Sequence, residues 1–186
     1  MCEDQVFENI DFTQQPLARD QYEACSFVNC NFSETDLSHC SFTECTFTAC
    51  NLSMVTVVNT TWNDARFENC KMLGVNFEHC NEHIFSVAFE GCMLNYASFY
   101  KRQLKKTNFK HCTMHEVDFI EADLTATIFQ DCDLTGAKFE NTNLEKADFR
   151  TAVNYTLDPA MNKVKKAQFS YPGVAGLLYK FDIIIK

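Results

Sequence analysis

The chain has 186 residues, a formal net charge of −9 and a sequence pI near 5.0, and 46% of its residues are hydrophobic. This length predicts one domain that is large enough to bury a core. The acidic balance disfavours direct binding to nucleic acid, and no apolar run approaches the length of a membrane span. Met1 to Asp4 lack the basic and apolar segments of a secretory signal, so we expect a cytoplasmic protein with no membrane partner.

A bulky apolar residue, here called a centre, recurs at every fifth position along most of the chain. A small residue or a cysteine lies two positions before most centres, and polar residues fill the other three places, as in Cys25–Leu37. Fifteen of the 18 phenylalanines are centres. The centres are Phe7, Phe12, Leu17, Tyr22, Phe27, Phe32, Leu37, Phe42, Phe47, Leu52, Val57, Trp62, Phe67, Met72, Phe77, Phe89, Leu94, Phe99, Leu104, Phe109, Met114, Phe119, Leu124, Phe129, Leu134, Phe139, Leu144 and Phe149.

A period of five fits neither a helix, where it turns successive centres by about 140°, nor a straight strand, where it alternates faces. We therefore predict an all-β fold of short extended segments joined at corners of about 90°, so that roughly twenty residues close a four-sided coil with the centres inside. One wall of this coil would contain Phe7, Phe27, Phe47, Phe67, Phe89, Phe109, Phe129 and Phe149, and another Leu104, Leu124 and Leu144.

The first coil, residues 5–23, is the least regular part of the pattern. Gln5, Gln15 and Asp20 take small inward positions, and Pro16 precedes a centre. A solenoid needs a polar end, so this segment is predicted to be a capping coil.

The repeat is regular from Cys25 to Phe77 and then breaks. Twelve residues separate Phe77 from Phe89 where ten would keep the register, which indicates a two-residue insertion within 80–87. We expect Ile84 at the missing centre, after a bulge or small loop. This is the one break in the repeat, and its candidate partner-binding residues are Asn81, Glu82, His83 and Phe85.

The eleven cysteines follow the repeat. Cys2 falls outside the small inward positions, and Cys80 fits if the first register continues; the other nine are Cys25, Cys30, Cys40, Cys45, Cys50, Cys70, Cys92, Cys112 and Cys132. Threonine, alanine and valine take equivalent places, so these sites select small size, and we expect buried free cysteines without disulfides.

Two clusters contain metal-ligand residue types, His79 to His83 and His111 to His115. In the second, Cys112 points inward and the two histidines point outward, so the three side chains do not converge on one ion. In the first, the register is broken, and both a metal site and a polar surface bulge are open, with the bulge favoured. We expect no metal, no cofactor and no catalytic residues.

The repeat is regular again from Phe89 to Phe149, and charged residues are unevenly distributed along the chain. Residues 5–100 carry 12 acidic and 3 basic side chains, and residues 111–152 carry 9 and 3. Between these acidic parts lies a basic belt of five side chains: Lys101, Arg102, Lys105, Lys106 and Lys110.

After residue 152 the pattern ends, which divides the chain into a repeat domain, 1–152, and a C-terminal module, 153–186. Asp158 and Pro159 predict a short helix over 159–167, and Ser170 and Pro172 predict a second over 173–180. Residues 181–186 have strand character. We expect this module to cover the open end of the coils.

The motifs Ala122–Ala126, Cys132–Gly136 and Ala147–Thr151 resemble the repeat of the pentapeptide-repeat family, and the resemblance covers about 150 residues. It implies a right-handed quadrilateral β-helix, here with a short helical C-terminal cap. The ending, with Leu157–Pro159, Gly176–Leu178 and Ile183–Ile185, is similar to the quinolone-resistance and microcin-resistance members. In those relatives the tail forms a dimer that binds DNA gyrase and topoisomerase IV, which implies a homodimer here through Leu177, Leu178, Phe181, Ile183, Ile184 and Ile185.

Three functions follow from these observations. The first is a non-catalytic acidic rod that binds an unidentified protein, because the fold supports many functions. The second is a DNA mimic that binds DNA gyrase or topoisomerase IV and gives quinolone- or microcin-type resistance, although the long coil-breaking loops of several such relatives are replaced here by a two-residue insertion. The third, an enzyme, is disfavoured because no acid, base and nucleophile converge.

Overall fold

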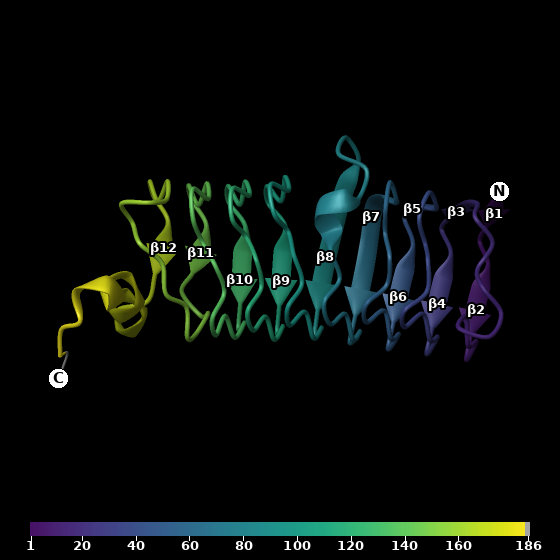
Figure 1. Ribbon diagram of the computed structural model, residues 1–186, viewed down its shortest axis with the longest axis horizontal. Helices are drawn as coiled ribbons and strands as arrows, with labels where there is room; N and C mark the ends of the chain where they lie inside the picture. The colour runs from purple at the N-terminus through teal and green to yellow at the C-terminus, as the bar shows by residue number, and fades with distance from the viewer. Residues whose placement is uncertain (185–186) are drawn as a thin grey trace.

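The five-residue period folds into short strands that stack through backbone hydrogen bonds. The computed structural model describes residues 1–184 and is a parallel β-solenoid of about eight turns (Figure 1). The predicted all-β quadrilateral β-helix is therefore confirmed. Its strands are β1 (Cys2–Glu3), β2 (Val6–Glu8), β3 (Gln21–Glu23), β4 (Ser26–Val28), β5 (Ser41–Thr43), β6 (Thr46–Thr48), β7 (Thr61–Glu68), β8 (Phe85–Glu90), β9 (Asn108–Lys110), β10 (Ile128–Gln130), β11 (Asp148–Phe149) and β12 (Gln168–Phe169).

Residues twenty positions apart pair in register, as for Phe7 with Phe27 and Phe27 with Phe47. The pairing runs β1-β3-β5-β7-β8-β9-β10-β11-β12, with β2, β4 and β6 stacked beside it and joining at β7. Four walls result, here called A to D, and each is defined by the centres that stack along it. Wall A contains Cys2, Tyr22, Phe42, Trp62, Phe85, Leu104, Leu124, Leu144 and Val164; wall B contains Phe7, Phe27, Phe47, Phe67, Phe89, Phe109, Phe129, Phe149 and Phe169; wall C runs from Phe12 to Leu134; wall D runs from Leu17 to Phe139.

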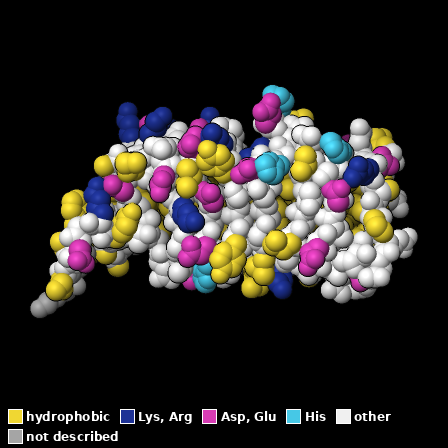
Figure 2. Space-filling model, viewed as in Figure 1, with side chains coloured by type: hydrophobic (Ala, Val, Ile, Leu, Met, Phe, Trp, Pro, Cys, Tyr) yellow, Lys and Arg dark blue, Asp and Glu magenta, His cyan; other side chains and the backbone are white. Residues whose placement is uncertain are grey.

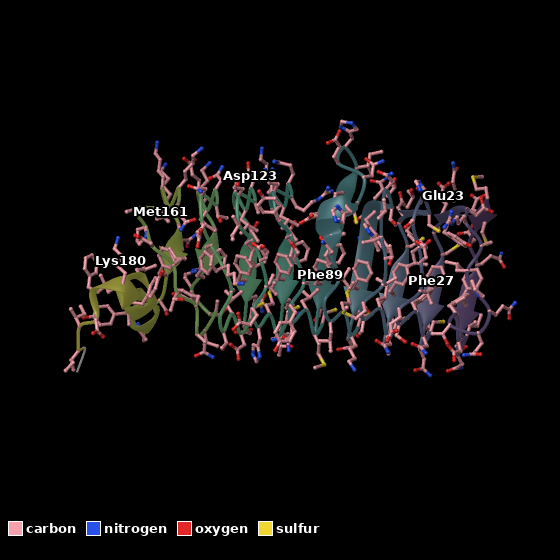
Figure 3. All side chains as sticks on the ribbon, in the orientation of Figure 1. Glu23, Phe27, Phe89, Asp123, Met161 and Lys180 are labelled. Carbon is pink, nitrogen blue, oxygen red and sulfur yellow. The ribbon has the colours of Figure 1, made fainter. Side chains whose placement is uncertain are left out.

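Wall B forms a continuous stack of aromatic rings inside the solenoid. Its neighbouring phenylalanine rings lie 4.6 to 5.4 Å apart between centroids and are nearly parallel. The predicted stack from Phe7 to Phe149 is confirmed, and it continues to Phe169. Phe27 and Phe89 point into the solenoid (Figure 3), where they are 0% and 1% exposed. Offset stacking adds stability beyond the burial of area.

The corners require an unusual backbone conformation. The residue two positions after most centres has a positive φ, for example 53° at Ala49 and 60° at Lys106. Many of these residues are neither glycine nor asparagine, although the left-handed region is unfavourable for other side chains. The stacking of successive coils therefore imposes the corner on whatever residue is present.

The insertion differs from the prediction for Ile84. Phe85, and not Ile84, pairs with Trp62 and takes the missing centre, while Ile84 is 45% exposed. Three residues, 82–84, loop out after Asn81. On the partner strand, two residues lie between Trp62 and Ala65, but only one lies between Phe85 and Val87. The three looped-out residues minus this one missing residue give the net insertion of two. The expected loop is present, but the centre follows it.

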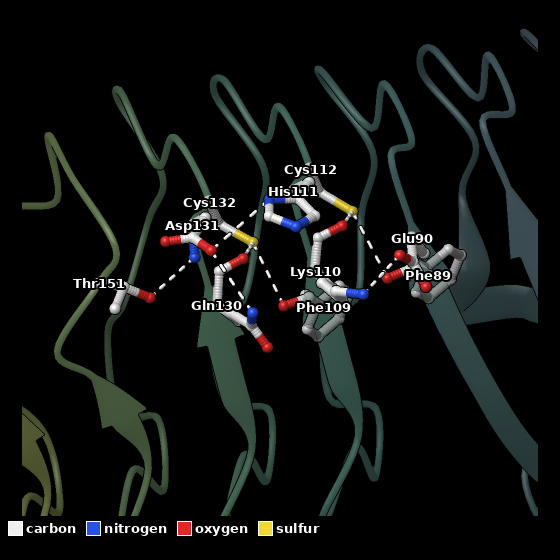
Figure 4. Close-up of polar contacts among 10 residues, drawn as sticks. All are labelled: Phe89, Glu90, Phe109, Lys110, His111, Cys112, Gln130, Asp131, Cys132 and Thr151. Carbon is white, nitrogen blue, oxygen red and sulfur yellow. Dashed lines mark hydrogen bonds and ion pairs between the residues drawn. The ribbon is translucent and has the colours of Figure 1, made fainter.

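The cysteines are free, and ten of the eleven are buried, with Cys2 half-buried. Cys112 donates to the carbonyl oxygen of Phe89 at 3.7 Å, and Cys132 donates to that of Phe109 at 3.4 Å (Figure 4). Burial raises the pKa of Cys45 and of Cys80 to about 12. Cys45 and Cys80 are thus protonated packing groups, and most buried cysteines of the coils also donate to backbone carbonyls, as Cys112 and Cys132 do.

The C-terminal prediction is partly wrong. Residues 159–167 form no helix; they continue the solenoid, with Asn143 bridged to Lys163 and β11 paired with β12. The second predicted helix is present as two 3-10 helices, η2 (Pro172–Leu177) and η3 (Tyr179–Phe181). Residues 182–184 are not a strand, and Ile185 lies outside the described residues.

The coils continue past residue 152 because residues of the next turn still find backbone partners twenty positions earlier. The tail then folds back over the last turn, where Leu157 donates to the Gly176 carbonyl at 3.2 Å. A Cβ atom at Gly176 would collide with the Tyr155 carbonyl oxygen, so this approach requires glycine. Within residues 1–184, no helix has both the length and the apolar character needed to span a bilayer.

Candidate protein-binding surface

Within residues 1–184, the accessible side chains lie on the outer walls and in the tail, because the centres and most small inward residues are packed inside. The cavities on the outer walls are shallow and are lined by mixed side chains, such as Phe67, Glu90 and Lys110 on wall B. Among residues 1–184 no group of His, Cys, Asp and Glu side chains has the arrangement of a metal site. The surface is therefore described below by its loop, its charges and its tail.

The loop between walls D and A protrudes from an otherwise even surface (Figure 1). Asn81 organises it: its Oδ1 accepts from the backbone N–H of His83 at 2.9 Å and of Ile84 at 3.2 Å, and its Nδ2 donates to Thr61 Oγ1 at 3.2 Å. Glu82 and His83 are 81% and 82% exposed at their side chains and lie 3.2 Å apart. Of the predicted loop residues, the structure thus exposes Glu82 and His83 and uses Asn81 to hold them.

Phe85, the fourth predicted loop residue, belongs mainly to the core. It packs edge-on against Phe77 at 5.8 Å, and the guanidinium of Arg102 lies over its ring at 4.3 Å. Phe85 therefore anchors the loop base, and Ile84 takes the exposed position.

Arg102 was predicted to be part of an exposed basic belt, and this prediction is wrong. Arg102 is only 5% exposed and donates to the carbonyl oxygens of Cys80 at 3.1 Å and Asn81 at 2.7 Å. The loop removes these carbonyls from the regular ladder, and Arg102 satisfies them. The sequence contained the signal for this role, because Arg102 occupies the small inward position two residues before Leu104.

The other belt residues lie outside, but most are paired with carboxylates of neighbouring coils. The distances are 3.5 Å for Lys101 to Glu121, 3.3 Å for Lys105 to Asp123 and 2.6 Å for Lys110 to Glu90. Figure 4 shows the Lys110 pair together with the contact between His111 and Asp131. The belt is thus largely neutralised by the acidic surface around it.

Many of the acidic side chains also have a structural role in the corners. Aspartate or asparagine directly before a centre accepts from the backbone N–H directly after that centre, as Asp133 does from Thr135 at 3.1 Å. Burial raises the pKa of Asp133, but hydrogen bonds from Thr135, Asn154 and His115 outweigh it and lower the pKa to about 2. Carboxylates of this kind remain charged and form fixed rows along the rod.

The predicted tail residues lie in different surroundings. Leu177 and Leu178 are half-buried, and Leu177 packs against the core of its own solenoid. Phe181, Ile183 and Ile184 are exposed by 59%, 56% and 86%. Lys180, labelled on the tail in Figure 3, donates to Asp158 at 2.7 Å. This contact ties the tail to the last coil.

The repeat matches a family model described as "Pentapeptide repeat region" over residues 21–99 and 82–156. The chain belongs to the pentapeptide repeat family. Its predicted membership is therefore confirmed.

Solved pentapeptide repeat structures resemble the chain at low identity. A trypsin-treated QnrB1, described as a plasmid-mediated fluoroquinolone resistance protein, is 20% identical, with 100% of this chain and 99% of that chain covered and a TM-score of 0.49. Full-length QnrB1 is 19% identical, with 97% and 99% covered and a TM-score of 0.46. HetL from the cyanobacterium Nostoc sp. strain PCC 7120 is 12% identical, with 91% and 86% covered and a TM-score of 0.40. No curated protein matches.

Proposed function

We propose that this pentapeptide repeat protein is a non-catalytic, cytoplasmic rod that binds another protein through its outer walls. The observation that carries the proposal is the filled interior: centres such as Phe109 and Leu124 are 0% exposed, so side chains that are free to contact a partner lie in rows on the outside. Rows on separate walls do not converge on one substrate, which argues against catalysis. Eleven free thiols suit a reducing compartment.

The loop is the proposed recognition element, because it projects beyond the rows of side chains on the coils of residues 1–169 (Figure 1). Asn81 and Arg102 hold its backbone in place, so binding through Glu82, His83 and Ile84 would lose little conformational freedom.

This proposal is tested with the protein as bait in a cell extract. We compare the wild type, a variant carrying Glu82→Ala and His83→Ala, and a matched control carrying Glu34→Ala and His39→Ala, which lie on other parts of the surface. A protein that is retained by the wild type and the control but lost with the loop variant is expected. Retention that is the same in all three would refute a role for the loop.

A second candidate is binding to DNA gyrase or topoisomerase IV as a DNA mimic. The net charge of −9 on a rod with carboxylates repeated at coil spacing favours it. The purified protein would then inhibit gyrase supercoiling, or relieve its inhibition by a quinolone, and the effect would weaken with salt. If the protein has no effect and does not bind either enzyme at micromolar concentration, this candidate fails.

We also propose that the tail forms a homodimer. Phe181, Ile183 and Ile184 present exposed apolar area at the end of the rod, where a two-fold axis would join two copies. Replacement of Phe181 and Ile184 by aspartate should give a monomer with intact coils. Truncation after Ser170 tests the same point without removing β12. An unchanged mass in solution for both variants would contradict the tail interface.

A further inference from the structure

Wall A differs from the other walls in the arrangement of its outward charges. On the four coils before the loop it carries five carboxylates and no lysine or arginine: Glu3, Asp4, Glu23, Glu44 and Asp64. On the four coils after the loop it carries six lysines and two carboxylates: Lys105, Lys106, Asp123, Glu145, Lys146, Lys163, Lys165 and Lys166. Across the described residues, walls B, C and D mix both signs along their length.

The separation is clearest at the corner position, two residues after each centre. Stacked coils place Asp4, Glu44 and Asp64 in this row on one side of the loop, and Lys106, Lys146 and Lys166 on the other. All six are exposed, and among residues 1–184 none of these three lysines has an ion-pair partner. In Figure 2 lysine and arginine side chains gather along the upper edge on the C-terminal side of the protruding loop.

We infer that wall A is an interface for a second copy of this chain, in an antiparallel arrangement about a two-fold axis at the loop. With such an axis, each row of side chains on one copy faces the same row on the other copy. The coils run in opposite directions, so the first coil of one copy faces the last coil of the other. This axis places Asp4 opposite Lys166 of the other copy and Asp64 opposite Lys106, twice each.

In the row directly after the centres, Glu3 lies opposite Lys165, whereas Glu23 lies opposite Glu145. The favourable pairs therefore lie at the two ends of the wall and beside the loop, and they outnumber this one like-charged pair.

The loop determines the register of this pairing. It projects at the middle of wall A, so any shifted arrangement would press it against the charged rows of the other copy. With the axis at the loop, each Ile84, which is 45% exposed, lies beside its symmetry mate. The interface then has an apolar centre flanked by complementary charges.

The contact shares Ile84 of the loop with the proposed partner site, so dimerisation and partner binding would compete there, but it is distinct from the tail interface. It depends on exposed ion pairs, which salt screens strongly. Association is therefore expected at an ionic strength of about 0.02 M and is expected to be lost at about 0.5 M.

The test is a charge exchange measured by sedimentation, with every protein carrying Phe181→Asp and Ile184→Asp to remove tail contacts. This background protein should be a dimer at low salt and a monomer at high salt. A Lys106→Glu, Lys166→Glu variant and an Asp4→Lys, Asp64→Lys variant should each be monomeric at low salt, and their equimolar mixture should form a dimer. A Lys71→Glu, Lys138→Glu control, on walls C and D, has the same change in charge as the first variant and should still dimerise.

Each result decides the proposal, once circular dichroism shows that all variants are folded. A monomeric background protein at low salt, a mixture that stays monomeric, or a control that loses dimerisation would overturn it. Because the assay contains no other protein, its failure would leave the proposed partner binding through the loop unaffected.

Discussion

At the scale of single residues, the outward positions of the repeat have separate tasks. The residue before a centre is often aspartate or asparagine, because its side chain accepts a hydrogen bond from the backbone across the centre, as in Asp123 with Thr125 at 3.0 Å. The residue two after most centres has a positive φ, and these residues include glutamate, lysine and alanine as well as asparagine and glycine. Polar residues that look interchangeable in the sequence are therefore divided into turn residues and residues under backbone strain.

Glycine at a strained corner should stabilise the fold. Ala49 is exposed and has a φ of 53°, so Ala49→Gly relieves strain that exceeds the entropy glycine adds to the unfolded chain. We expect a gain of about 0.5–1 kcal/mol in the free energy of unfolding, measured in urea. The control Thr48→Gly, within β6, should instead lose stability. A loss in both variants would contradict the strain argument.

Acid should remove the contribution of Asp133. Its folded pKa of about 2 lies below the ordinary aspartate value of 3.8, so its stabilisation is complete above the ordinary pKa and is lost as the pH falls toward 2. After allowance for its partial exposure, this contribution is on the order of 1–2 kcal/mol. The difference in unfolding free energy between the wild type and Asp133→Asn should therefore shrink between about pH 5 and pH 2. A difference that is independent of pH would count against this role.

At the scale of elements, each coil is stabilised by its neighbours, and the insertion shows what happens where this support is interrupted. The loop leaves the carbonyls of Cys80 and Asn81 without partners in the ladder, and a buried arginine replaces the missing donors. The cation lies on the Phe85 ring, and among residues 1–184 no Asp or Glu is buried with it. Burial accordingly lowers the pKa of Arg102.

Replacement of Arg102 by methionine should loosen the loop. Two buried carbonyls lose their donors, at a cost that removal of the buried charge partly offsets, so we expect a net loss of about 1–3 kcal/mol. Limited proteolysis should then cut within residues 82–84. Lys106→Met, which changes an exposed lysine, is the control. Equal resistance of the two variants to protease would argue against the anchoring role.

The aromatic stack predicts large effects of core substitutions. Phe109 lies 5.3 Å from Phe89 and from Phe129 between ring centroids. Phe109→Ala should cost about 3–5 kcal/mol in urea unfolding, and Phe109→Asp should cost more because it buries a charge. Phe181→Ala, at an exposed site, should change stability little. A small effect at Phe109 would mean that the stack tolerates a gap.

At the scale of the whole molecule, the protein is a rod in which contacts are made between adjacent coils and the outward side chains of each coil form its surface. The tail covers the C-terminal end (Figure 1). Its side chains Phe181, Ile183 and Ile184 remain exposed. From Cys25 to Cys132 the solenoid also shields its thiols from solvent. The reactivity of the buried thiols therefore measures whether the coils stay folded in solution.

The folded protein should show a single reactive cysteine. Cys2 is half-buried near the open N-terminal coil, and the other ten are buried. A thiol reagent should modify Cys2 first and the remaining ten only after unfolding, since reaction requires an accessible thiolate. Mass spectrometry of the modified peptides measures this order. Rapid modification of Cys112 or Cys132 in native buffer would contradict a closed solenoid.

The sequence by itself determined the repeat, the inward direction of the centres and the burial of the cysteines, because a five-residue period is strong and each coil repeats the same local chemistry. Only the tertiary structure decided where the register recovers after Asn81, since Ile84 and Phe85 are both apolar and packing against Trp62 selects between them. Tertiary pairing also extended the coils beyond residue 152. Residues 159–167, predicted to be helical, instead form backbone hydrogen bonds with the preceding coil. Likewise, the position of Arg102 and the alignment of charges on wall A depend on which residues stack twenty positions apart.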